Sequence, residues 1–205
     1  DAVVLVDSDD ILHESRVAAA REALATSELY GCALRLVNQQ GRDLGMTFSL
    51  PLGTKAGEVL PRHNVFGLSN TAYRSALLQR CLPVPTDVAL VAWFLATKAW
   101  LMGARLAFDP VVRMDYRQHG ANMARVRFPI SPKQVIKDTE LVRHHFEFVL
   151  ALNPSGFLPE RLVHLKNTAS SIETFHQHIV PEPSRLLRYV ESLNSLAPAP
   201  LWWSS

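Results

Sequence analysis

Three aspartates follow directly on an apolar run at the start of the chain. Residues 2–6 are all Ala, Val or Leu, and Asp7, Asp9 and Asp10 come immediately after them. Buried parallel strands read as continuous Val and Leu runs, and ligands of open α/β sheets collect at the carboxyl ends of such strands. Carboxylates this close repel one another unless a cation such as Mg²⁺ or Mn²⁺, bound together with substrate phosphates, neutralises them. Asp9 or Asp10 could equally cap the helix expected next, because acids favour a helix N-terminus.

A second polar cluster, residues 115–122, follows a predicted strand later in the chain. It contains Arg117, Gln118 and His119, followed by Gly120. Histidine coordinates divalent cations through a neutral ring nitrogen, arginine binds phosphate oxygens bidentately, and glycine lets the backbone approach a ligand closely. Taken alone, the cluster is also compatible with an ordinary exposed loop.

A third cluster, within residues 64–74, contains Gly67, Ser69 and Asn70 and leads into a predicted helix. The first turn of a helix presents backbone N–H groups that can bind an anion or sugar hydroxyls. The alternative is an N-cap at Ser69 or Asn70, a position that both residue types favour.

The elements that must position these clusters alternate between strand and helix up to residue 128 and are helical beyond it. Segment 50–62, rich in proline and glycine, is expected to be a loop. The expected strands are 3–6, 32–38, 105–108 and 111–115. The expected helices are 15–25, 70–80, 88–102, 135–152, 158–180 and 184–196.

The composition of the 205-residue chain is that of a globular protein, with 48% hydrophobic and 20% charged residues. The formal net charge of +2 does not indicate a nucleic-acid partner. Cys32 and Cys81 form no recognisable disulfide or zinc motif. Neither a membrane span nor a signal peptide is apparent, so we expect a cytoplasmic location.

In their order along the chain, the clusters resemble those of family-2 glycosyltransferases of the GT-A fold, especially the bacterial rhamnosyltransferase-like members. The matching segments are the Asp-Ser-Asp-Asp-Ile run at 7–11, segment 67–74, the Trp-Phe-Leu-Ala run at 93–96 with Gly103, and segment 116–122. The resemblance implies an α/β fold, in which a GT-A-like mixed sheet flanked by helices starts at the DXD strand and is followed by a C-terminal helical extension. The corresponding regions are 1–128, the GT-A-like glycosyltransferase region, and 129–205, the extension.

The resemblance further implies inverting, metal-dependent transfer of a sugar from a nucleotide-diphosphate donor to a hydroxyl acceptor, in glycan or polysaccharide biosynthesis. Asp7 and Asp9 would be the DXD motif that holds Mn²⁺ or Mg²⁺, and His119 would complete the metal site. The acceptor would be a glycan or a lipid-linked molecule, reached in the cytoplasm or at the inner face of the membrane. The residues expected to bind substrate are Gly67, Ser69, Asn70, Trp93, Arg117 and Gln118.

Two features depart from the family pattern. The family places its general base, an aspartate, directly before the aromatic residue of the long helix, where this chain has Ala92. The nearest carboxylate, Asp87, could act as the base from a shifted loop or could cap the helix that follows.

The chain also starts at the DXD strand, without the nucleotide-binding segment that precedes it in the family. The sheet would then expose an edge, which a second copy of the chain or a partner chain could cover.

A second function therefore stays open beside the transferase. The chain could be a non-catalytic GT-A-like binding or interaction protein that has lost the catalytic base and the nucleotide half. Ala92 and the shortened start favour this alternative. The intact acids Asp7 and Asp9, with Arg117 and His119, favour the enzyme, because clustered charges at a strand end are costly without a ligand to bind.

Overall fold

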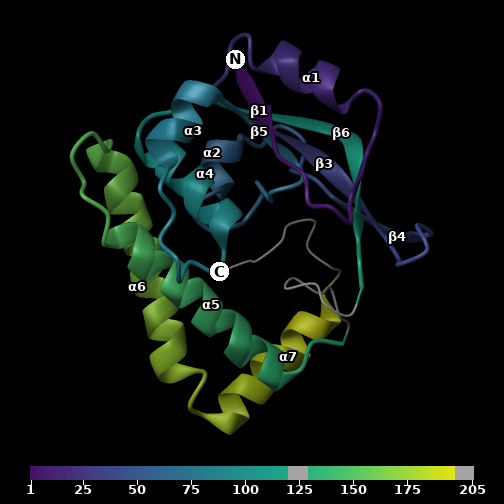
Figure 1. Cartoon of the computed structure of the whole chain (residues 1–205). Helices are drawn as coiled ribbons and strands as arrows, with labels where there is room; N and C mark the ends of the chain where they lie inside the picture. Colours follow the sequence, from purple (N-terminus) through teal and green to yellow (C-terminus); the bar gives the residue numbers. More distant parts are fainter. Residues whose placement is uncertain (120–128, 197–205) are drawn as a thin grey trace.

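The computed structural model describes residues 1–119 and 129–196, with a mixed sheet at the centre and helices on both of its faces (Figure 1). The strand order is β1-β5-β3-β6-β2, with β4 paired to β3. Strands β3 and β6 are parallel, whereas the other described pairs are antiparallel. The strands are β1 (Ala2–Val4), β2 (Ile11–Leu12), β3 (Leu29–Val37), β4 (Asp43–Phe48), β5 (Thr71–Arg74) and β6 (Leu106–Arg117).

The central strand β3 separates two layers of hydrophobic core, because successive side chains of a strand point to opposite faces. Leu34 and Leu36 pack toward α1 (Arg16–Ala23) in one cluster of buried residues. Leu29 belongs to the other cluster, with α4 (Val91–Leu101). Strand β3 is almost entirely buried, which explains why its sequence is apolar at both even and odd positions.

The segment expected as one helix over 70–80 is divided between two elements, which corrects the sequence-based prediction. Residues Thr71–Arg74 form β5, and the helix α3 (Ser75–Cys81) starts only after it. Strand β5 pairs with β1 on one side and with β3 on the other, and Ala72 and Tyr73 are fully buried there. These contacts outweigh the local helical tendency, which is weak compared with tertiary packing.

Two further predictions about the sheet region need correction. The strands expected at 105–108 and 111–115 form the single strand β6, which passes through Pro110 beside a register irregularity opposite Cys32 and Ala33. Proline is tolerated in a strand at such bulges. The segment expected as a loop over 50–62 contains a short helix, α2 (Ala56–Val59). Strand β4 was not predicted, although Leu44, Met46 and Phe48 alternate with more polar or smaller residues as in a half-buried strand.

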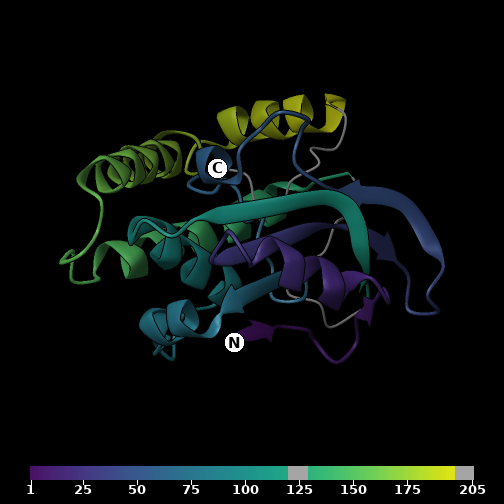
Figure 2. The ribbon, with the colours of Figure 1, turned by 90° about the horizontal axis from the view of Figure 1, so that it is seen from above.

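The three predicted C-terminal helices are present, as α5 (Pro132–Leu150), α6 (Pro159–His178) and α7 (Pro183–Ser195). Each begins with proline, which lacks the N–H that a first helical residue would leave unpaired. Helices α6 and α7 lie along one side of the molecule and β1 along the other (Figure 2). None of the helices in the described residues is both long and apolar enough to span a bilayer.

The extension shares its hydrophobic core with α4. The ring of His145 in α5 stacks on Trp93 with a centroid distance of 4.1 Å and an interplanar angle of 9°. Phe146 of α5 and Leu165 of α6 belong to the same buried cluster as Trp93. Helices α4, α5 and α6 are therefore held together by one continuous apolar interface.

Candidate functional site

The loop between β1 and β2 carries the aspartates, and strand pairing brings it to the end of β6. Ile11 of β2 lies opposite Asp115 of β6 in an antiparallel pair. The chain continues beyond Arg117, the last residue of β6, to His119. The Nε2 atom of His119 lies 2.5 Å from Oδ2 of Asp9. The hydrogen bond with His119 lowers the pKa of Asp9 below its ordinary value, so this carboxylate is charged at neutral pH.

Arg117 holds the loop of aspartates in place. Its backbone N–H donates to Oδ1 of Asp10 at 2.9 Å, and its Nε donates to the backbone oxygen of Asp9 at 2.7 Å. Its Nη1 donates to the backbone oxygen of Gln39 at 2.7 Å, which ties the loop after β3 to the same group. In this structure the guanidinium thus orders the backbone around the acids.

Asp10 has one oxygen that is not satisfied. Oδ2 of Asp10 is buried and accepts no hydrogen bond in the described part of the chain. Burial raises the pKa of Asp10, and the nearby hydroxyl of Ser69 and the hydrogen bond from the N–H of Arg117 only partly offset that effect. A buried carboxylate oxygen without a partner is costly, and a nearby cation would lower that cost.

Ser69 and Asn70 fasten the loop to the sheet. The backbone N–H of Asp7 donates to Oγ of Ser69 at 2.9 Å, while the Asp7 side chain is exposed. The amide of Asn70 donates to the backbone oxygens of Cys32 and Val65 at 2.8 and 3.1 Å. Because β5 follows, these residues cap no helix, and the expected anion-binding helix N-terminus is not formed here.

Gly67 lies beside the side-chain amide of Asn70. A Cβ atom at this position would approach Oδ1 of Asn70 to 3.3 Å, so a larger residue would press on a buried side chain. Gln118 continues the pairing of β6 with β3, since its backbone N–H donates to the oxygen of Val37 at 2.8 Å. Gly120 and the rest of the second polar cluster lie outside the described residues.

Residues Asp9 and His119 fit a divalent cation of the Mg²⁺ or Mn²⁺ type. A carboxylate and an imidazole suit Mn²⁺, and a diphosphate and water can supply the other ligands. The unsatisfied oxygen of Asp10 lies on the same loop. No group of three or more His, Cys, Asp or Glu side chains is arranged to hold a metal within residues 1–119 and 129–196, so Asp7 does not join the pair in this arrangement.

Trp93 lies in the core and not on the surface. It is fully buried, and its indole N–H donates to the backbone oxygen of Leu60 at 2.9 Å. Its neighbour Ala92 is buried in the first turn of α4. Asp87 lies exposed in the turn before α4, and no hydrogen bond in the described residues shows it capping that helix.

One charged network was not foreseen from the sequence. Oδ1 and Oδ2 of Asp115 accept hydrogen bonds from Nε and Nη2 of Arg35, both at 2.9 Å, and Nε2 of His13 lies 3.1 Å from Oδ1. Desolvation raises the pKa of Asp115, but the bonds from Arg35 and His13 outweigh it and the pKa is lowered overall. The network ties β2, β3 and β6 together.

Comparison with solved structures finds glycosyltransferases. A mannosyltransferase from Pyrobaculum calidifontis, in complex with GDP-Man and Mn²⁺, has a TM-score of 0.50 and 19% sequence identity, over 96% of this chain and 56% of its own. TarS from S. aureus, residues 1–349 in complex with UDP-GlcNAc, has a TM-score of 0.48 and 18% identity, over 85% of this chain and 48% of its own. The chain thus spans about half the length of these proteins. No family model and no curated protein matches the sequence. The chain has a GT-A-like glycosyltransferase fold.

Proposed function

We propose that this chain belongs to an inverting, metal-dependent glycosyltransferase, which moves a sugar from a nucleotide-diphosphate donor to a hydroxyl group of a glycan or a lipid-linked acceptor. The observation that carries the proposal is the contact between Asp9 and His119 at the end of β6, in a chain with a glycosyltransferase fold. The mannosyltransferase of similar fold is in complex with both GDP-Man and Mn²⁺, a ligand pair that suits these two side chains.

The donor site in this proposal is built around the loop of aspartates. Asp9 and His119 hold Mn²⁺ or Mg²⁺, with Asp7 as a further ligand once the donor is bound. A cation held there would stabilise the charge that develops on the leaving diphosphate. Arg117 keeps the loop in place and adds positive charge beside the phosphates. The buried oxygen of Asp10 gains a favourable interaction when positive charge enters the site.

The sugar in this proposal lies near Gly67, Ser69 and Asn70, and Gln118 is a further residue proposed to contact it. Ser69 already contacts the loop of aspartates through the N–H of Asp7, so sugar and diphosphate would be neighbours. Trp93 is left out of the sugar site, because its polar atom is bonded inside the core. Asp87 is the proposed general base, which accepts the proton of the acceptor hydroxyl as the new glycosidic bond forms.

The test of this proposal is calorimetric titration of the chain with UDP, GDP and dTDP, with and without Mn²⁺. We expect at least one of these nucleotides to bind and Mn²⁺ to strengthen its binding. Binding that Mn²⁺ leaves unchanged would contradict the proposed cation site. The absence of any binding in the protein with its complete natural sequence would contradict the donor site altogether.

A second function has one specific observation in its favour. The family's base position is occupied by Ala92, which is buried and cannot accept a proton. A non-catalytic GT-A-like binding or interaction protein would need no base. It would bind a glycan or a nucleotide sugar without turnover, so measurement of product release from a labelled donor distinguishes the two functions.

A further inference from the structure

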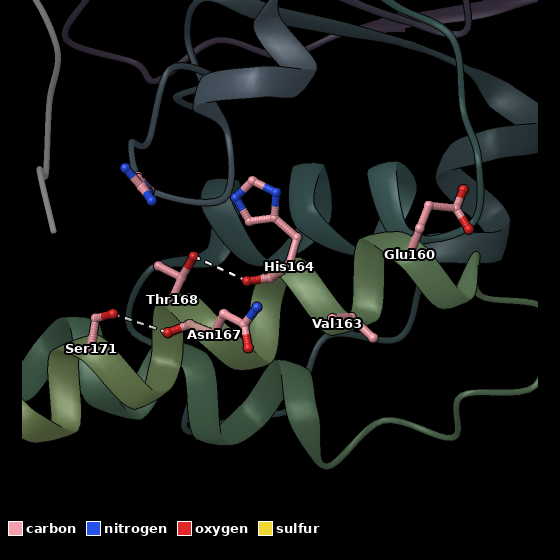
Figure 3. Close-up of a pocket in the computed structure, with 7 residues that line it drawn as sticks. Glu160, Val163, His164, Asn167, Thr168 and Ser171 are labelled. Carbon is pink, nitrogen blue, oxygen red and sulfur yellow. Dashed lines mark hydrogen bonds between the residues drawn. The ribbon is translucent and has the colours of Figure 1, made fainter.

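A polar groove lies on α6, apart from the donor site. It has a volume of about 340 Å³, within the range of roughly 300–1,000 Å³ of small-molecule sites. Figure 3 shows the labelled side chains projecting from α6. The lining residues are Arg62, Glu160, Val163, His164, Asn167, Thr168 and Ser171. None of them belongs to the proposed donor site.

The residues that α6 contributes to the groove lie on one face of the helix. Glu160, His164, Asn167 and Ser171 are three or four residues apart, which places them on one face of α6. Arg62, from the segment after α2, forms the facing side. These side chains therefore converge from two segments that are distant in sequence.

Two hydroxyl groups in the groove have a fixed hydrogen-bonding role. Oγ1 of Thr168 donates to the backbone oxygen of His164 at 3.2 Å, and Oγ of Ser171 donates to that of Asn167 at 3.1 Å (Figure 3). Because their hydrogens are engaged, these oxygens offer lone pairs to a ligand. The ring of His164 meets Trp100 edge to face, with centroids 6.2 Å apart, which restricts its orientation.

The polar groups in the groove differ from those nearer the end of α6. There, Glu173 and His176 form ion pairs with Arg143 and Glu140 of α5, so they serve helix packing. Within the described residues, no hydrogen bond or ion pair joins the side chain of Glu160 or Asn167 to another side chain. The amide and the carboxylate in the groove are available to a ligand.

The charge balance favours a neutral ligand. The charges of Arg62 and Glu160 cancel, and the remaining lining groups are an imidazole, an amide, hydroxyls and one Val side chain. The groove thus has no net charge to attract a phosphate or a metal ion. It offers donors and acceptors side by side, which matches sugar hydroxyls, since each of them donates and accepts.

We propose that this groove binds a neutral saccharide and holds part of a glycan acceptor. The assignment of the saccharide as acceptor rests on the proposed function, but the binding itself does not. A glycan engaged both at α6 and at the transfer site would be retained after each transfer, because the second contact is intramolecular.

The experiment is NMR titration of the ¹⁵N-labelled chain with maltose, lactose and N,N′-diacetylchitobiose, and separately with inorganic phosphate. We expect at least one disaccharide to shift the amide signals of His164, Asn167 and Ser171. The variant Asn167→Ala should weaken this binding about fivefold, because one or more hydrogen bonds are lost. Lys166→Ala, a neighbouring exposed residue that does not line the groove, should bind as the unmodified chain does.

Several results would overturn the proposal. Shifts caused by phosphate but not by the disaccharides would mean an anion site, and an unchanged affinity in Asn167→Ala would place binding elsewhere. No shift with any of the three disaccharides would exclude the saccharide site. Asp9→Asn should leave these titrations unchanged, so a failure of the donor site and a failure of the groove are separate results.

Discussion

The imidazole of His119 is hydrogen-bonded to the carboxylate of Asp9, although 110 positions separate them in the sequence. The contact exists because β2 pairs with β6, which places the loop after β1 against the residues that follow β6. Arg117 adds two hydrogen bonds to the same loop. The strongest candidate for chemistry in this chain is therefore a junction between its beginning and the end of its longest strand.

Substitution of Asp9 by asparagine tests this junction as a cation site. Asn is a weaker cation ligand than a carboxylate, so we expect Asp9→Asn to abolish the Mn²⁺-dependent binding of a nucleoside diphosphate in calorimetry. Glu14→Gln removes an exposed carboxylate just beyond β2 and should leave binding unchanged. Equal binding by Asp9→Asn and the unmodified chain would mean that the cation is held elsewhere.

Trp93 should matter for stability and not for ligand binding. The variant Trp93→Phe loses the hydrogen bond to Leu60 and part of the stacking on His145, so we expect the free energy of unfolding to fall by about 2 kcal/mol. Urea denaturation measures this change. Donor affinity should be unaltered, and a selective loss of affinity without a loss of stability would return Trp93 to the substrate site.

Acid should weaken the network around Asp115. A carboxyl group whose pKa is lower in the folded than in the unfolded chain stabilises the fold above its unfolded pKa of about 3.9, and this contribution is lost as the pH falls through the folded pKa. Since the pKa of Asp115 is lowered by Arg35 and His13, we expect the free energy of unfolding to decrease below about pH 4.

The variant Asp115→Asn identifies the source of that decrease. It should be less stable by about 2 kcal/mol at pH 7 and should show a smaller loss of stability in acid, as measured by urea denaturation across pH 2 to 6. Glu14→Gln is again the control and should keep the original acid dependence. If Asp115→Asn and the unmodified chain lost stability in parallel, the acid effect would arise from other carboxylates.

The proposed base can be tested without affecting the donor site. Asp87→Asn should lower the rate of sugar transfer by about 10²-fold or more, because a positioned base contributes that much, while the affinity for the nucleoside diphosphate stays constant. Thr86→Ala changes the exposed neighbour and is the matched control. Undiminished transfer by Asp87→Asn would exclude this residue as the base.

The native Arg16 side chain is expected to lower the free energy of unfolding of this protein. Its side chain is fully buried, and its three guanidinium nitrogens have no hydrogen-bond partner among the described residues. The guanidinium carbon lies over the ring of Tyr30, 4.9 Å from its centroid, and this cation–π contact offsets part of the cost of burying the charge. We expect Arg16→Met to raise the free energy of unfolding by about 1–4 kcal/mol. Arg21→Met, exposed on the same helix, should change it by less than about 0.5 kcal/mol.

Much of the fold could be predicted from the sequence because the apolar periodicity of most helices and strands lies within each element. Helices α5, α6 and α7 show apolar spacing of helical period, and the observed bounds differ by only a few residues from those expected. Strand β3 was predicted over residues 32–38 from their alternation, and it begins three residues earlier, at Leu29. Strand β5 was not predicted, because its conformation depends on simultaneous pairing with β1 and β3, which no local pattern encodes.

The candidate site was predictable in part. The resemblance placed Asp9 and His119 in one site, and the structure brings the two side chains together, while their role as metal ligands stays a prediction. The partnership of Asp115 with Arg35 and His13 depends on the register of three strands, so composition and spacing did not indicate it. The resemblance placed Trp93 at the substrate, and its stacking on His145 could not be foreseen because the two residues lie far apart in the sequence.

The contact between Trp93 and His145 limits how this protein can be shortened. A chain cut at residue 128 would lose α5 and α6, and the apolar side of α4 that they cover would face water. Trp100 would lose the guanidinium of Arg161, which lies 5.3 Å from its ring centroid. Such uncovered apolar patches promote self-association. Recombinant production of the sheet region should therefore retain the chain at least through residue 178, and aggregation of shorter versions would say nothing about function.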